Sequence, residues 1–123
     1  MYPKDDLIKL LSIKNKIEAI NTIIDRHKTI TSALQDIEGQ PAILMLLVAI
    51  SEQFSKLSQK KATLLCHFHP DDIKGLISVR NYIAHDYDGL NLSIIEDDLR
   101  ENMPKILTIV TQILNDENTH TSR

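Results

Sequence analysis

The chain has 123 residues, enough for one domain with its own core, and we expect a single domain over residues 1–123. Trp is absent and Gly and Pro are scarce, which favours helices over sandwiches and barrels, since those need many turn residues and aromatics. The net charge of −3 argues against a protein that binds nucleic acid through its overall charge.

The charge is unevenly distributed. Residues 56–85 hold five Lys and Arg against two Asp, a net +3, together with three His. Residues 86–123 hold three basic and eight acidic residues, a net −5. The centre of the chain can therefore attract phosphate while the C-terminal part repels it, although solvated surface explains such a distribution equally well.

The sequence favours a soluble, cytoplasmic protein without a membrane partner. A single cysteine, Cys66, allows no internal disulfide, and its apolar neighbours indicate that it is buried. The N-terminal residues carry acids where a signal peptide needs a basic region. The longest apolar run, at 42–50, is far shorter than the roughly 20 residues of a membrane helix.

The first helix is expected at about 5–26, where apolar residues recur with the 3.6-residue period. They are Leu7, Leu10, Leu11, Ile17, Ile20 and Ile24. Ser32 and Gln35 then have the spacing of a capping box, which predicts a single-turn helix ending near Gly39.

The second helix is expected from Pro41, which suits a first turn, to about Ser58. Its first half is apolar on all sides, so we expect it to be covered by the core and by a second subunit. The apolar residues 62–68 that follow do not distinguish helix from strand.

The third helix is expected to begin at Pro70, with Asp71 and Asp72 in its first turn, and to stop at Asp88-Gly89. On a helical wheel its apolar residues form one stripe, and Arg80 falls at the centre of that stripe. A buried guanidinium costs several kcal/mol unless it is paired, so Arg80 is an unusual residue.

The fourth helix is expected to start at a capping box formed by Ser93 and Glu96, with a kink at Pro104. Its apolar stripe consists of Ile95, Leu99, Met103, Ile106, Val110 and Ile113. Together the segments predict an all-α protein, an up-and-down bundle of four main helices with one possible extra short helix.

The polar segment at 80–89, RNYIAHDYDG, is the candidate site. Tyr87 would share the face of Arg80 if the helix continued, but His85 is turned by about 140°. Either the helix ends near His85 or a second copy completes the site. As structural alternatives, Arg80 could pair with Glu52 or Asp86, His85 could stabilise a helix C-terminus, and Tyr87 could be a core aromatic.

RNYIAHDY fits the pattern R-x4-H-x-Y, and the chain resembles the HepT-like toxins of the HEPN family, which pair with a minimal nucleotidyltransferase antitoxin. Residues 49–58, AISEQFSKLS, are similar to a helix of that family in which Glu52 takes the place of a glutamate. The Asp98-Leu99 segment and the run from Pro104 resemble the family's last helix. Ser51 stands where that family usually has a glycine, and HPDD replaces its usual Pro-Trp.

The resemblance implies a homodimeric, metal-independent endoribonuclease that cuts tRNA or mRNA without a cofactor. Arg80 and His85 would be catalytic, Tyr87 would receive AMP from the antitoxin, and Asn81, Asp86 and Glu52 would support the site. The chemistry fits these residue types, because His titrates near neutrality and Arg binds phosphate oxygens.

The alternative is a non-catalytic dimer that binds a nucleotide or the nucleotidyltransferase, which the acidic composition also fits. We expect no metal site, since the spacing in Cys66-His-Phe-His69 matches no standard zinc pattern and no second half exists. The acids at 96–98 are typical of a helix N-terminus.

Overall fold

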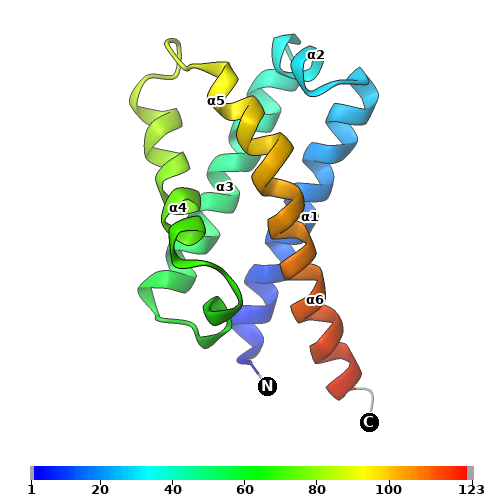
Figure 1. Cartoon of the computed structure of the whole chain (residues 1–123), viewed down its shortest axis with the longest axis vertical. Helices are drawn as coiled ribbons and strands as arrows, with labels where there is room; N and C mark the ends of the chain where they lie inside the picture. Colours follow the sequence, from blue (N-terminus) through cyan, green and yellow to red (C-terminus); the bar gives the residue numbers. More distant parts are fainter. Residues whose placement is uncertain (1, 122–123) are drawn as a thin grey trace.

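The protein is an up-and-down bundle whose chain passes four times along its length (Figure 1). The computed structural model describes the backbone of residues 2–121 and the side chains of residues 2–118. Within this range there are helices, turns and no strand, so the all-α prediction is confirmed. The elements are α1 (Lys4–His27), α2 (Ile30–Gln35), α3 (Gly39–Gln59), the 3-10 helix η1 (Thr63–His67), α4 (Pro70–His85), α5 (Leu92–Asp97), the π-helical turn η2 (Asp98–Asn102) and α6 (Met103–Thr121).

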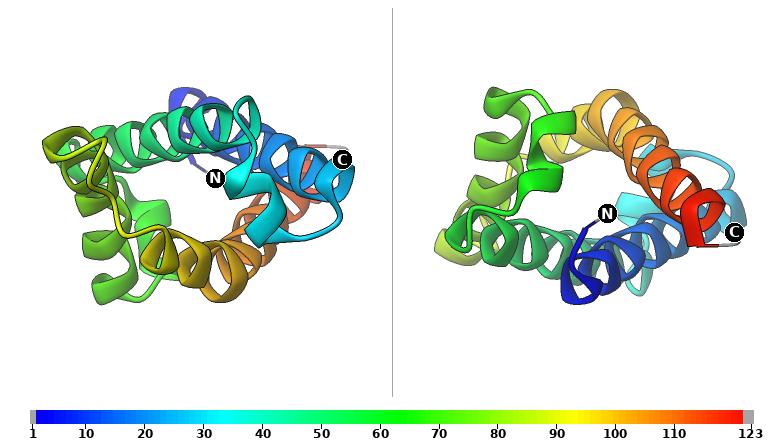
Figure 2. Two further views of the ribbon diagram at one scale, coloured as in Figure 1. Left: turned by 90° about the horizontal axis from the view of Figure 1, so that it is seen from above. Right: turned by 90° about the horizontal axis from the view of Figure 1, so that it is seen from below.

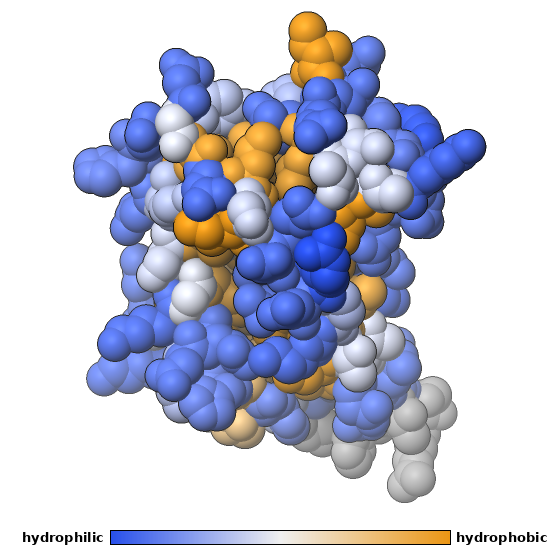
Figure 3. All heavy atoms as spheres, turned by 45° about the horizontal axis from the view of Figure 1, so that its top comes forward, coloured by the Kyte–Doolittle hydropathy of each residue, from blue (hydrophilic) through white to orange (hydrophobic). Residues whose placement is uncertain are grey.

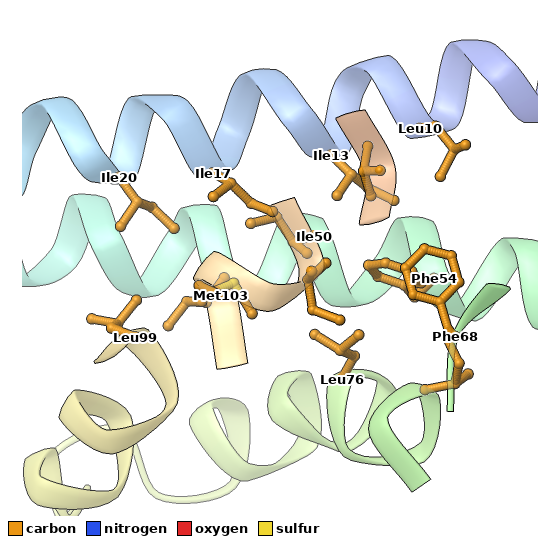
Figure 4. Packing of buried hydrophobic residues seen from close by; sticks show 14 of the residues in the cluster. Leu10, Ile13, Ile17, Ile20, Ile50, Phe54, Phe68, Leu76, Leu99 and Met103 are labelled. Atoms are coloured by element: carbon orange, nitrogen blue, oxygen red, sulfur yellow. The ribbon is translucent and has the colours of Figure 1, made fainter. Parts of the chain in front are cut away.

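α3 is the central helix of the bundle. It packs against α1 on one side and α4 on the other, and α1 also packs against α6. The end views show α4 set apart from α6, so that α3 is its main support (Figure 2). Side chains from all four long passes meet in one core, where Phe54 and Phe68 contact each other edge to face (Figure 4).

The apolar periodicity predicts most of this core. All six residues of the predicted stripe in the last pass are buried, as are Leu10, Ile17 and Ile20 in α1. Leu11 is 47% exposed, so its assignment to the stripe is wrong, and Ile13 takes the buried position instead. Cys66 is also exposed, because η1 turns it away from the core into which Leu64 points.

The helix ends differ from the predicted ones where another side chain provides a better cap. Thr29, not Ser32, caps α2 by accepting a hydrogen bond from the Ser32 amide. Asn91, not Ser93, caps α5 in the same way. In both caps the acceptor lies two or three residues before the donor amide. The capping-box pattern therefore predicts the correct helix start but assigns the cap to the wrong residue.

The last pass is irregular just before Pro104, where η2 lies between α5 and α6. Proline has no amide hydrogen to donate to the preceding turn, and a π-helical turn is one way for a helix to accommodate that gap. Inside η2, Asn102 donates to Asp98 Oδ1 over 2.9 Å. Asp98 Oδ2 is buried without a hydrogen-bond partner among the described residues.

α3 is long and apolar enough to cross a membrane by length and composition alone. Its packing gives another explanation for that composition, because Ile43, Leu47, Ile50 and Phe54 are buried in the core. Met45 on this helix is 63% exposed, and the predicted covering by a second subunit stays a prediction.

The buried carboxylate of Asp6 gives a first prediction. Asp6 is 1% exposed and forms a short ion pair with Lys60 at the end of α3. Lys60→Met should lower the free energy of unfolding by about 1–3 kcal/mol in urea titrations, since the carboxylate would lose its charged partner. Lys56→Met, an exposed change on the same helix, should stay within about 0.5 kcal/mol. Equal effects of the two variants would contradict this role.

Asp98 gives a second prediction. Burial raises the pKa of this carboxyl above its usual 3.8, partly opposed by the Asn102 amide. The folded state therefore holds the proton more tightly than the unfolded state, and stability falls as pH rises from the usual carboxyl range through the raised pKa. Asp98→Asn should raise the melting temperature, and more at about pH 7 than at about pH 4. Asp97→Asn, at a neighbouring carboxylate that is 66% exposed, serves as the control. A gain that does not depend on pH would contradict the titration of Asp98.

Candidate functional site

The segment 80–89 lies at the end of the bundle opposite both termini, where α4 stops and the chain turns into α5 (Figure 1). α4 begins at Pro70, as predicted, with His69 as its cap. It ends at His85, which agrees with one of the two alternatives left open by the sequence. Arg80, His85 and Tyr87 are all exposed, so three reactive side chains share one accessible end of the molecule.

Arg80 is not buried, which contradicts the helical-wheel prediction. Its side chain is 53% exposed. The cause is the close approach of α4 to α3 at this level, where the buried Ser51 hydroxyl donates to the Ile77 carbonyl over 2.9 Å and accepts from the Arg80 amide over 3.3 Å. The backbone of Arg80 thus lies against α3, and the long side chain extends along the surface into solvent.

Two polar side chains contact the Arg80 guanidinium. Nε lies 4.0 Å from Glu52 Oε2, and Nη1 donates to Asn81 Oδ1 over 3.5 Å. The Glu52 pairing proposed from the sequence is therefore present, and the Asp86 pairing is not. Because Glu52 is itself 51% exposed, the pair is screened by water and leaves the guanidinium available to a stronger anion.

His85 and Asn81 lie one helical turn apart and line the same hollow. This side of α4 is turned away from the Arg80 side by the helical geometry. Asn81 nevertheless contacts Arg80, so the three residues form a continuous polar surface around the end of α4.

Asp86 ends the helix instead of pairing with a cation. Its carboxylate and its carbonyl both accept from the Gly89 amide, over 3.1 and 3.2 Å. Gly89 does not adopt the left-handed conformation expected of a helix stop. It allows the close approach of the Asp86 carboxylate, which a Cβ at this position would displace.

Tyr87 lies in this turn, outside the helix, and is 45% exposed. It is therefore neither a core aromatic nor aligned with Arg80 along a helix face. A hydroxyl on an exposed turn is accessible to another protein or to a nucleotide.

Two residues near the site were not singled out from the sequence. The Tyr82 hydroxyl accepts from the Asn91 amide over 3.1 Å and so connects α4 to the start of α5. Leu90 is half-buried and lines the hollow beside His85. Tyr82 belongs to no sequence motif that would mark it as a site residue. Its role depends on the chain turning back at residues 86–91, which brings the Asn91 amide to its hydroxyl.

A larger groove of about 440 Å³ lies between α4 and the α5–η2–α6 arm. Figure 3 shows apolar residues gathered on the upper part of this face with hydrophilic residues around them. The described lining of the groove includes Asp71, Asp72 and Asp98 and has no Lys, Arg or His. Because this lining offers no cation to a phosphate, the end of α4 is the better candidate for a nucleic-acid site.

Comparison with family models matches residues 13–113 to the family described as ribonuclease HepT-like. No match was found among curated proteins or among solved structures. The matched range covers most of the chain, from the middle of α1 into α6, and includes the whole segment 80–89. The chain belongs to the HepT-like ribonuclease family.

Proposed function

We propose that this protein is an endoribonuclease toxin that cuts RNA with Arg80 and His85. The observation that carries the proposal is the joint exposure of the two side chains at the end of α4, in a chain of a ribonuclease family. The polar contact of Arg80 with Asn81 supports a shared phosphate-binding surface. Either tRNA or mRNA would be a substrate, and the cytoplasm is where this chain would meet it.

The reaction needs a proton acceptor, a proton donor and a cation, and no metal. A base removes the proton of the ribose 2′-hydroxyl, whose oxygen attacks the adjacent phosphorus. The bond from phosphorus to the 5′-oxygen breaks, and that oxygen takes a proton from an acid. The products carry a 2′,3′-cyclic phosphate and a 5′-hydroxyl. An imidazole can accept or donate a proton and a guanidinium can bind phosphate oxygens, so we assign the proton transfers to His85 and the charge on the phosphate to Arg80.

A homodimer would supply both proton-transfer groups. One chain has one His85, whereas two chains related by a two-fold axis bring two. The outer side of α3 and α4 supports such a contact. Met45 lies two turns from Glu52 on α3, and Ala84 lies one turn from Arg80 on α4, so exposed apolar side chains border the charged pair.

The partner that controls the toxin would be a minimal nucleotidyltransferase that transfers AMP to Tyr87. The exposed position of Tyr87, next to the turn of Asp86, supports this role. An added adenylyl group brings bulk and a negative charge close to Arg80 and His85, which would block the site and compete for the guanidinium.

The second candidate is a non-catalytic dimer that binds a nucleotide or the nucleotidyltransferase. The internal ion pair of Arg80 with Glu52 and the net charge of −3 favour it, because both weaken the attraction of the site for RNA. The two functions differ in whether RNA is cut.

Cleavage of a labelled single-stranded RNA in EDTA tests the proposal. His85→Ala should lower the rate by about 100-fold to 10,000-fold, as expected for a lost general acid or base. Arg80→Ala should be similarly impaired, and Arg80→Lys should keep part of the activity because the charge remains while the bidentate geometry is lost. His67→Ala, at the opposite end of the bundle, should cleave like the unchanged protein. Full activity of His85→Ala would contradict the mechanism, and no cleavage by any form would favour the non-catalytic dimer.

Mass spectrometry after co-expression with a cognate nucleotidyltransferase tests the modification. The peptide that contains Tyr87 should gain the mass of one or more AMP groups, and RNA cleavage should fall with the modified fraction. Tyr87→Phe should lose the modification and escape inhibition, since it lacks the acceptor hydroxyl. Tyr2→Phe, a change near the termini, is the control. AMP on another residue, or none, would refute the role of Tyr87.

A further inference from the structure

A hollow of about 330 Å³ lies against the last turn of α4, on the side of His85. It is separate in its lining from the larger acidic groove except for Tyr82, which borders both. Six residues line it, and they are Asn81, Tyr82, His85, Asp86, Gly89 and Leu90. His85 is thus at once the proposed acid–base group and part of the wall of a small cavity.

Contacts within the turn shape the wall of the hollow. The Tyr82 ring is 37% exposed and held in place through the hydrogen bond of its hydroxyl with the Asn91 amide. Gly89 lies directly against the Asp86 carboxylate, and its amide donates to Asp86 Oδ1 over 3.1 Å. The half-buried Leu90 completes an apolar wall. An aromatic ring beside an aliphatic side chain suits a flat ligand with apolar faces.

Polar groups stand beside the apolar wall. Asn81 can donate and accept through its amide. Asp86 uses Oδ1 to accept from Gly89, and its carboxylate can also accept from a ligand. A ring with hydrogen-bonding groups on its edge and apolar faces is the chemical description of a nucleobase.

We propose that this hollow holds the nucleobase of the nucleotide at the cleavage point, with that base unpaired. The proposal rests on the ribonuclease function proposed above. A base seated beside His85 brings its own ribose to the proton acceptor. A base within a duplex is stacked and paired and cannot enter the hollow.

The charge of the protein supports stacking as the source of affinity. At a net charge of −3, and with Asp86 and Asp88 in the turn, attraction to a duplex backbone is weak. Stacking of a base on an aromatic side chain does not depend on net charge and contributes strongly for single strands. Tyr82 and Leu90 are therefore specificity-determining residues, distinct from Arg80 and His85.

The experiment compares cleavage of three matched RNAs by the full chain: a single strand cut at one site, the same strand annealed to its complement, and the same strand with an abasic nucleotide at the cleavage point. The single strand should be cut at least about 10-fold more efficiently than either of the others, as expected for the loss of one stacked base. This arm uses the unchanged protein, so it does not depend on whether a variant folds. Equal cleavage of the three RNAs would overturn the proposal.

Variants locate the effect. Tyr82→Ala and Leu90→Ala should raise KM for the intact single strand by about 10-fold with a smaller change in kcat. The two substitutions should change KM for the abasic RNA little, because that RNA already lacks the base that these side chains would contact. Ile94→Ala, an exposed apolar change outside the hollow, is the matched control. Equal losses of Tyr82→Ala on intact and abasic RNA would overturn the assignment of the base to this hollow.

A measurement of nucleotide binding distinguishes the base-binding hollow from the proposed ribonuclease function. NMR titration of His85→Ala protein with 5′-AMP should shift the amide signals of Tyr82, Gly89 and Leu90, and the double variant His85→Ala with Tyr82→Ala should bind more weakly. Binding at these residues without RNA cleavage by the unchanged protein would support a nucleotide site and refute the nuclease. Cleavage that ignores the abasic change, with no shift at these residues, would refute the base-binding hollow and leave the nuclease standing.

Discussion

The close packing of α4 on α3 through Ser51 is the contact on which the geometry of the site depends. The buried Ser51 hydroxyl bonds to the backbone of α4 at both Ile77 and Arg80. It fixes the height and rotation of α4 on the bundle. The helical wheel places Arg80 on the core side of α4, but this contact directs its guanidinium outwards.

The end of α4 supplies the second constraint. Because Asp86 and Gly89 fold the chain into a tight turn immediately after His85, the motif divides into a helical part and a turn part. The helical part carries Arg80, Asn81 and His85 with fixed spacing, and the turn carries Tyr87 into solvent. One short segment thus offers a cation, an imidazole and an accessible phenol in three different directions.

The sequence predicts the four main helices and their order, because the apolar residues of each helix recur with the helical period and the same residues form the core. The buried stripe of the last pass, Ile95 to Ile113, is an example. It predicts helix ends less well, because Thr29 and Asn91 compete with nearby residues of equal capping ability. The exposure of Arg80 could not be predicted, since it depends on how closely a different helix approaches. The hollow beside His85 needs the return of the chain from Gly89 to Asn91, which no periodicity encodes.

α4 packs mainly on one neighbour, α3, while an apolar groove separates it from the α5–η2–α6 arm, which it contacts through the 3.0 Å ion pair of Asp72 with Lys105. A helix anchored along a single line can tilt about that line with little loss of buried surface, and regions with few contacts open at lower free energy than the rest of a domain. Arg80, His85 and the turn that carries Tyr87 would move together with α4 in such a tilt. The spacing of Arg80, His85 and Tyr87 within the segment would then stay constant, while the distance of the whole segment from α6 would change.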